Sequence, residues 1–495
     1  MQRTVKVSDF YICLGKGFVM QKKILYVIDD GNTDKKIKML QEQILPENLV
    51  AEVTAVPRGC NKATYYNEVG RESEAEYTIY LNGDFCICDT NMTLMLLETL
   101  RHNKDAALVG LHGTNKFSVD LCQWQNDFAN FPVGVYTAKI INSTVLATSK
   151  FIPWRENTGL DDGLLYMGYV IDVQKQNKKT VVLAHKENYL KNEIFSSLER
   201  DGIQVFQKIY GKDLLPLVSV LIPTYNRCDL FSLALKSVLE QDYPNLEIIV
   251  SDDGTNDETE KYIQPYLKDE KLNIKYKHHK NFTFKKNWLW LLENFHGDYF
   301  NFLMDDDLFA PNKISRMVSG YITNPNVVLV TSYRQFIDIN GNYIMGHEPL
   351  ADIDTIFDGK DIIKKTVSSL KNFIGEPTTV LLHKRSKSIM KEYIQENSAI
   401  IDVKTSLKIL ETGDLLYISE PLSFFRVHKN QDQRSLERII DSRYHWLKLF
   451  SEYTQNEKYL SREEAGRTAC DVIVPNYIEP MELFCKILKN KTSGI

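Results

Sequence analysis

Apolar segments of strand length that end in acidic or amide residues recur in both halves of this 495-residue chain. They read ILYVIDDGNTD (24–34), EYTIYLNGD (76–84), IIVSDDGTND (248–257) and DYFNFLMDD (298–306). Asp30 precedes Asp84 by 54 residues, and Asp253 precedes Asp307 by the same 54. Strands that alternate with helices form mostly parallel sheets, and ligands bind such sheets beyond the carboxyl ends of the strands. The sequence therefore predicts an α/β fold with two related domains in tandem.

The chain length and the spacing of these segments predict the domain boundaries. A chain of 495 residues is too long for a single core, since domains average about 150 residues. We expect a first domain at 22–200, a second at 216–435 and a helical C-terminal region at 436–495. Residues 1–21 are left unassigned, and the junction is expected near 200–215.

Composition and charge exclude several classes of protein. A formal net charge of −5, with basic residues scattered among acids, argues against a nucleic-acid-binding protein. The longest apolar stretches, such as 217–223, are far shorter than the roughly 20 residues that a membrane-spanning helix needs, and the first residues lack a signal-peptide core. Eight irregularly spaced cysteines favour free thiols in a reducing compartment, so we expect a cytoplasmic protein. Peripheral contact with the inner face of a membrane and a homo-oligomer both stay open.

The second half carries the motifs with chemical content. LVSVLIPTYN (217–226) is a buried strand that stops at Pro223, and residues 227–241 have the apolar spacing of a helix. In the next strand, EIIVSDDGTND, Gly254 permits a sharp exit. A further strand and helix carry Asn281, Lys286 and Asn287 and lead to FLMDDDLFAP.

The order IPTYN, SDDGTND, NFTFKKN and FLMDDDLFAP, within residues 216–435, resembles the large family-2 glycosyltransferases, which have the GT-A fold. The resemblance implies two GT-A-like domains and an inverting, metal-dependent transferase that moves a sugar from a nucleotide-sugar, with UDP as the expected nucleotide. It also implies a glycan or glycoprotein acceptor, in bacterial surface polysaccharide biosynthesis or protein glycosylation.

Binding a nucleotide-sugar requires a platform for the base and acceptors for its N–H group and the ribose hydroxyls. We expect Pro223, Thr224 and Tyr225 to form the platform, and either Asp252 or Asp253 to accept the N–H of the base. The resemblance adds further donor-site residues, which are Asn226, Lys286, Asn287, Glu376 and Arg426.

Three consecutive carboxylates, Asp305, Asp306 and Asp307, predict a cation site, because they cannot all be ionised cheaply side by side. Hard oxygen ligands suit Mg or Mn. The resemblance assigns Asp305 to the ribose and Asp306 to the metal, with Asp307 and His428 as further ligands. Many family members have D-x-D-D here, whereas this chain has Met304 at the first position, so the choice of carboxylate stays open.

Glycosyl transfer also needs a base, since an acceptor hydroxyl must lose its proton as it attacks an oxocarbenium-like centre. The resemblance of residues 400–431 to the family implies that Asp402, at the start of a helix, is this base, and one base opposite the leaving group gives inversion. Arg426 and His428 match a closing R-x-H motif. Arg426 is either a phosphate contact or part of a structural ion pair, and His428 either binds the metal or a phosphate.

Residues 22–190 resemble another GT-A-like branch of the glycosyltransferases, with Asp161, Asp162 and His185 at the expected places. Its metal motif is reduced to Asn82-Gly83-Asp84, and one carboxylate binds a divalent ion poorly. We therefore expect a non-catalytic or acceptor-binding domain. The alternative is a second active transferase, which would make the protein bifunctional.

Two other classes of function are alternatives to the transferase, a nucleotidyltransferase and a glycan-binding pseudoenzyme. A sugar-nucleotide nucleotidyltransferase would have a Gly-rich basic loop after the first strand, where this chain has PTYNR. A glycan-binding pseudoenzyme would not need intact Asp305–Asp307 and Asp402. The transferase is therefore favoured over both for the second half, whereas a glycan-binding pseudoenzyme stays open for the first.

Overall fold

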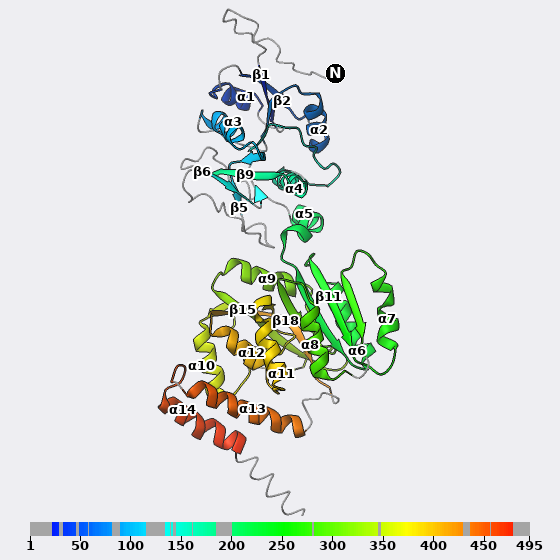
Figure 1. The fold of residues 1–495 in the computed structure, drawn as a ribbon, viewed down its shortest axis with the longest axis vertical. Helices are drawn as coiled ribbons and strands as arrows, with labels where there is room; N and C mark the ends of the chain where they lie inside the picture. The colour runs from blue at the N-terminus through cyan, green and yellow to red at the C-terminus, as the bar shows by residue number, and fades with distance from the viewer. Residues whose placement is uncertain are drawn as a thin grey trace, which may run out of the picture. The chain divides into compact units, whose positions relative to one another are not determined.

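The computed structural model divides into two compact units, residues 1–214 (unit 1) and 215–495 (unit 2), whose elements are labelled in Figure 1. The structure describes residues 22–28, 33–45, 49–57, 59–81, 90–114, 134–138, 140–141, 145–160, 162–184, 200–279, 282–344, 348–428, 436–455 and 457–478. Several residues singled out above lie outside these ranges, namely Asp30, Asn82, Gly83, Asp84, Asp161, His185 and Asn281. The junction expected at 200–215 is largely a helix, α5 (Arg200–Leu214), which ends unit 1.

The first sheet of unit 2 has the order β12-β11-β10-β13-β17. Four of these strands are parallel and β17 (Leu382–His383) is antiparallel to β13. The parallel strands are β10 (Val218–Thr224), β11 (Leu246–Asp252), β12 (Ile274–His278) and β13 (Tyr299–Phe302). Every residue of β10 is buried, as expected of a parallel strand covered on both faces. The covering helices are α6 (Cys228–Leu239), α7 (Glu258–Leu267) and α8 (Phe284–Asn294).

The second sheet of unit 2 is built on β18 (Asp414–Arg426), which pairs in parallel with β15 (Val327–Ile337). Two short strands pair antiparallel with β18, namely β14 (Leu308–Phe309) and β16 (Thr355–Phe357). A bridge between Val330 and Leu381 joins this sheet to the first. The remaining helices before β18 are α9 (Lys313–Thr323), α10 (Gly359–Ser369), η2 (Lys384–Ser386), α11 (Lys387–Gln395) and α12 (Ile401–Leu410).

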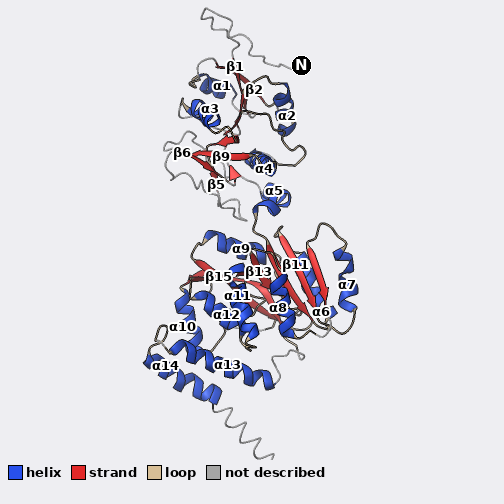
Figure 2. Cartoon of the chain, in the orientation of Figure 1, coloured by secondary structure: helices blue, strands red, loops and turns tan. Residues whose placement is uncertain are grey.

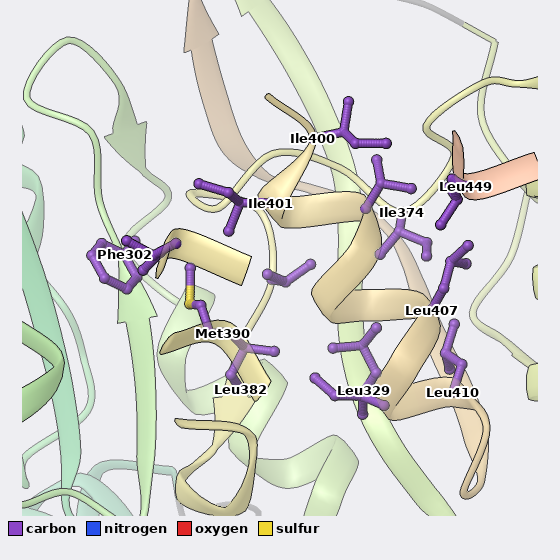
Figure 3. Close-up of a cluster of buried hydrophobic side chains, with 14 of the residues drawn as sticks. Phe302, Leu329, Ile374, Leu382, Met390, Ile400, Ile401, Leu407, Leu410 and Leu449 are labelled. Carbon is purple, nitrogen blue, oxygen red and sulfur yellow. The ribbon is translucent and has the colours of Figure 1, made fainter. Parts of the chain in front are cut away.

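The C-terminal helices belong to the core of unit 2. They are α13 (Leu436–Thr454), α14 (Arg462–Thr468) and a π-helical segment η4 (Ala469–Ile478), and α13 and α14 lie against α10 (Figure 2). Trp446, Leu449, Leu460 and Ile473 share one buried cluster with residues of β13, β15 and α12. Figure 3 shows Ile374 in this cluster beside Leu407 of α12 and Leu449 of α13. Residues 436–478 therefore complete the domain that precedes them.

Unit 1 has a seven-stranded sheet in the order β2-β1-β3-β8-β4-β9-β6. Its strands are β1 (Lys22–Ile28), β2 (Leu49–Ala55), β3 (Tyr77–Leu81), β4 (Ala106–Gly110), β6 (Gly134–Thr137), β8 (Val145–Thr148) and β9 (Lys179–Ala184), beside a small pair β5 (Gly113–Thr114) and β7 (Ile140–Ile141). The helices before α5 are α1 (Thr33–Gln41), α2 (Lys62–Glu72), α3 (Met92–His102) and α4 (Asp162–Lys175).

The two units share one strand order, which confirms the expectation of two related α/β domains in tandem. Six strands of each unit are compared, and the Val330–Leu381 bridge links the two sheets of unit 2 into one order. Three parallel strands are followed by one antiparallel strand and then by two strands that are parallel to each other. The order is β2-β1-β3-β8-β4-β9 in unit 1 and β11-β10-β13-β17-β15-β18 in unit 2. The equal 54-residue spacing is not part of this correspondence. It pairs β1 with β11, whereas β1 holds the place of β10, between its two parallel neighbours. β1 and β11 were matched by spacing because a similar Asp-Asp-Gly sequence lies at the end of each, although the two strands hold different places in their sheets.

Among the helices in the described ranges, none combines the length and the apolar character needed to cross a membrane.

Candidate active site

The carboxyl ends of β10 and β13 bring Thr224 and Asp305 together. Thr224 Oγ1 donates to Asp305 Oδ2 over 2.9 Å, and the backbone N–H of Tyr225 donates to the same oxygen over 3.4 Å. Asp305 is buried, and burial raises the pKa of its carboxyl to about 7, although the Arg227 guanidinium opposes the shift. Asp305 thus fixes the turn after β10, and Tyr225 is left 50% exposed.

Asn226 joins the loops that follow β10 and β11. Its φ of 53° lies in the left-handed region, which Asn tolerates better than most residues. Its Oδ1 accepts from the Thr255 N–H over 2.7 Å and its Nδ2 donates to Thr255 Oγ1 over 3.0 Å. A Cβ at Gly254 would lie 2.9 Å from Asn226 Oδ1, so only glycine allows the two loops to approach.

Asp252 and Asp253 have different partners. Asp252 is buried, and its two oxygens accept from the Gly254 N–H and the Tyr276 hydroxyl, each over 2.8 Å. Asp253 is half-buried, and its Oδ1 accepts from Asn287 Nδ2 over 2.9 Å. Burial, aided by the charge of Asp252, raises the pKa of Asp253 to about 6. Of the two aspartates, Asp253 has the geometry that suits contact with a base.

Asp306 lies where the end of β13 meets the residues after β18. Its Oδ2 is 3.0 Å from Arg227 NH1 and 2.9 Å from His428 Nε2. The same guanidinium places NH2 3.0 Å from Asp305 Oδ1. Arg227 therefore bridges two carboxylates that would otherwise repel each other, and the side chain of Asp306 stays 12% exposed.

Asp307 faces inward. Its Oδ2 accepts from Thr378 Oγ1 over 2.6 Å and its Oδ1 accepts from the Arg426 N–H over 3.0 Å. Complete burial, with the neighbouring Asp306 charge, raises the pKa of Asp307 well above its usual value. Both Asp307 oxygens thus accept hydrogen bonds from the surrounding chain, whereas the contacts of Asp306 with Arg227 and His428 both use Oδ2.

Arg426 is buried and its guanidinium binds backbone carbonyl groups. Nε donates to the Asp306 carbonyl over 2.8 Å, and NH1 donates to the carbonyls of Asp338 and Ile339 over 2.9 and 3.0 Å. Of the two roles that the sequence left open for Arg426, this geometry favours the structural one.

Asp306 and His428 fit a divalent cation as a partial ligand set. Of the His, Cys, Asp and Glu side chains in the described ranges, no group of three is arranged to hold a metal alone. Mg and Mn sites in phosphate-transferring proteins commonly use one or two carboxylates, with phosphate oxygens and waters as the other ligands. A carboxylate and an imidazole at the strand ends, next to the expected diphosphate position, meet that requirement.

Asp402 lies in the first turn of α12, half-buried, beside the loop that precedes β17. Its Oδ2 accepts from Asn372 Nδ2 over 2.9 Å. Burial raises its pKa to about 6, the Glu376 charge adds to the shift, and Arg334 opposes it. Arg334 Nε lies 2.9 Å from Glu376 Oε2, an ion pair without the alignment of a hydrogen bond.

Two further residues were expected at the donor site, Pro223 and Lys286. Pro223 is buried within β10, one residue before Thr224. Lys286 is exposed in the first turn of α8, where its N–H is capped by Thr283 Oγ1, and Asn287 beside it is buried.

Three residues that contact the aspartates of the site were not singled out from the sequence, namely Arg227, Thr378 and Asn372. Arg227 directly follows the PTYN turn at the end of an apolar strand, where a cation can meet acids that end a neighbouring strand, and this was a usable signal. Thr378 and Asn372 contact Asp307 and Asp402 across 71 and 30 residues, and the sequence offers no signal for such pairs.

Comparison with known families agrees with this geometry. Residues 219–395 match the model of "Glycosyl transferase family 2", and residues 23–201 match that of "Glycosyltransferase like family". The matched ranges fall in unit 2 and unit 1, respectively.

Relatives in bacteria carry related names. An uncharacterized glycosyltransferase of Rickettsia typhi is 36% identical over 286 residues, which cover 56% of this chain and 87% of that protein. A GalNAc(5)-diNAcBac-PP-undecaprenol β-1,3-glucosyltransferase of Campylobacter jejuni is 25% identical, over 56% of this chain and 85% of that enzyme. Others are longer: the chain spans 19% of an uncharacterized glycosyltransferase of Rickettsia bellii, at 34% identity over 27% of this chain.

Among solved structures, Staphylococcus aureus TarS 1–349 in complex with UDP-GlcNAc is 15% identical over 53% of this chain and 75% of that chain, with a TM-score of 0.40. Likeness at this level carries no weight for function. The family match in unit 2 and the Rickettsia typhi relative, which this chain covers almost throughout, give the conclusion: the chain belongs to glycosyltransferase family 2.

Proposed function

We propose that unit 2 transfers a sugar from a nucleotide-sugar, most simply a UDP-sugar, to an acceptor hydroxyl, with metal dependence and with inversion at the anomeric carbon. The observation that carries the proposal is the contrast between Asp306 and Asp307. Asp306 is partly exposed and lies beside His428 at the strand ends, with both of its side-chain contacts on Oδ2, whereas both oxygens of the buried Asp307 accept hydrogen bonds from Thr378 and Arg426.

Residues at the ends of β10 and β11 would bind the nucleotide. The exposed Tyr225 ring offers a wall for the base, and Asp253 offers an acceptor for its N–H. The buried Asn287 donates from Nδ2 to Asp253 Oδ1 over 2.9 Å and so would orient that carboxylate. Lys286, exposed beside it, can meet a phosphate.

Asp402 would take the proton of the acceptor. A carboxyl with a pKa raised to about 6 is still ionised at neutral pH and is a stronger base than an ordinary aspartate. As the acceptor oxygen bonds to the anomeric carbon, the bond from that carbon to the diphosphate breaks and the proton passes to Asp402. A divalent ion held by Asp306 and His428 would stabilise the charge on the leaving diphosphate.

The acceptor class and the setting are part of the proposal. The Campylobacter jejuni relative is named for transfer to a lipid-linked oligosaccharide, which supports a glycan or glycoprotein acceptor in bacterial surface glycan synthesis. Cys60, Cys228 and Cys470 are free thiols, as in proteins of a reducing cytoplasm.

The proposal is tested by nucleotide release from a panel of sugar nucleotides with Mn²⁺ or Mg²⁺, with water as the acceptor. We expect one donor to be turned over by the wild type, only with metal, and not by Asp306→Ala. Equal release by Asp306→Ala and the wild type would contradict metal dependence at this site. Absence of nucleotide binding by the wild type would overturn the proposal as a whole.

A bifunctional enzyme is the second candidate, and the shared strand order favours it. In unit 1, α4 precedes β9 as α12 precedes β18, and α4 begins at Asp162 much as α12 carries Asp402 in its first turn. The same panel distinguishes the candidates. Turnover of a second donor that Asp84→Ala removes would show two active units; a single donor unaffected by Asp84→Ala would leave unit 1 as an accessory domain.

A further inference from the structure

We infer that Asn372 is a positioning residue for Asp402: it holds one carboxylate oxygen so that the other faces the acceptor. The inference rests on the proposed function, in which Asp402 is the base. It is carried by the hydrogen bonds of a single loop, residues 372–379, which precedes β17 and which we call the positioning loop.

The Asn372 amide can have only one orientation. Its Oδ1 accepts two backbone N–H groups, from Ile374 over 3.1 Å and from Gly375 over 3.0 Å. A flipped amide would aim its NH₂ group at these two donors. Nδ2 must therefore point the other way, where it donates to the Gly375 carbonyl over 3.1 Å and to Asp402 Oδ2 over 2.9 Å.

The positioning loop is itself held at several points, so Asn372 is fixed in space. Ile374 is buried in the core beside Leu407 of α12 (Figure 3), and its carbonyl accepts from Thr331 Oγ1 over 2.5 Å. Gly375 has a φ of +119°, and a Cβ there would lie 2.7 Å from Thr379 Cβ. Lys313 Nζ donates to the Thr379 carbonyl over 2.9 Å.

The same loop contacts the metal side of the site. Thr378 Oγ1 donates to Asp307, the residue next to Asp306, and Asn372 donates to Asp402. One short segment thus sets the positions of both the base and the acidic triplet, which is what an in-line displacement requires of its base and leaving-group sites.

Asn372 also affects the pKa of Asp402, together with the charged groups that face this carboxylate. Glu376, on the same loop, raises the Asp402 pKa, and Arg334 of β15 and the N–H groups of the first turn of α12 lower it. An N–H donated to a carboxylate favours the ionised form. The Asn372 amide therefore works with Arg334 and against Glu376 to keep Asp402 ready to accept a proton.

The test is the pH profile of donor turnover, measured as UDP release from a UDP-sugar with Mn²⁺ and water. Asn372→Asp keeps the size of the side chain but sets a second carboxylate against Asp402. We expect the acid limb of the profile to move up by about one pH unit or more. Asn372→Ser removes the amide donor; we expect a smaller upward shift and a turnover number lower by about tenfold. UDP affinity should change in neither variant.

Asn324→Asp is the matched control, because Asn324 also donates from Nδ2 to a backbone carbonyl, at the far end of α9. It should leave the profile unchanged. If Asp402→Asn is inactive while both Asn372 variants keep the wild-type acid limb, the inference is overturned and the proposed function stands. The same holds if both lose UDP affinity with that limb unchanged, since this marks a merely structural role. If Asp402→Asn turns over the donor normally, Asp402 is not the base and both fail.

Discussion

Asp252 and Asp253 are adjacent in sequence, yet their carboxylates have opposite surroundings. Asp252→Ala would leave the Gly254 N–H and the Tyr276 hydroxyl without their acceptor, and we expect the free energy of unfolding to fall by about 2–4 kcal/mol. Asp253→Ala should instead weaken UDP binding by roughly tenfold with little loss of stability. Urea unfolding and calorimetric titration with UDP, applied to both variants, measure the two effects separately. Identical behaviour of the two variants would contradict this assignment.

Asp306 and Asp307 form a second matched pair. Asp306→Ala should abolish Mn²⁺ binding, measured by electron paramagnetic resonance in the presence of UDP. It should lower the free energy of unfolding less than Asp307→Ala does, because its partner Arg227 is 36% exposed and keeps its ion pair with Asp305. Asp307→Ala should lower the free energy of unfolding by about 2–4 kcal/mol, because Thr378 and Arg426 lose a buried partner. Retention of Mn²⁺ affinity in Asp306→Ala would show that another residue holds the ion.

Sequence reasoning found these aspartates because they follow apolar strands, but it could not divide their roles. The division depends on partners far along the chain: Tyr276 lies 24 residues from Asp252, and Arg426 lies 119 residues from Asp307. Arg426 illustrates the same limit. The R-x-H motif could be recognised from the sequence. The hydrogen bonds from the Arg426 guanidinium to the carbonyl groups of Asp338 and Ile339 could not be predicted from it.

At the scale of elements, the positioning loop depends on Gly375. Gly375→Ala would force a side chain into a φ of +119° and within 2.7 Å of Thr379 Cβ. We expect the free energy of unfolding to fall by about 1–3 kcal/mol and donor turnover to fall with UDP affinity kept. Gly341→Ala is the control, since its φ is +87° but nothing lies within 4 Å of its Cβ. Equal effects of the two substitutions would show that backbone conformation alone, and not the packing against Thr379, decides the outcome.

The long buried strands were predictable and the short ones were not. β10 and β11 have seven residues each and are mostly apolar and buried, which is typical of parallel strands covered on both faces. β17 has only two residues and is defined by its neighbours β13 and, through Leu381, β15. Because the place of β17 depends on neighbouring strands, the spacing of motifs did not predict the strand order. It therefore also did not predict that β1 corresponds to β10.

At the scale of the whole molecule, unit 2 has a core of its own. The buried cluster around α12 draws its members from residues 221–473, all within unit 2. We expect a fragment of residues 215–495 to fold, to bind UDP and to turn over the donor as the full chain does. Circular dichroism and the UDP-release assay measure this directly. A folded fragment that binds UDP without turnover would show that unit 1 takes part in the reaction of unit 2.

The junction between the two sheets of unit 2 bears on how readily the site opens. The sheet of β10, β11 and β13 and the sheet of β15 and β18 meet at the Val330–Leu381 bridge, where the Leu381 N–H donates to the Val330 carbonyl over 3.1 Å. The contact between Asp306 and His428 joins the same two sheets at their active ends. Any opening that parts them exposes the Leu381 amide to solvent. The exchange of that one hydrogen for deuterium therefore reports the free energy needed to part the two sheets at the site.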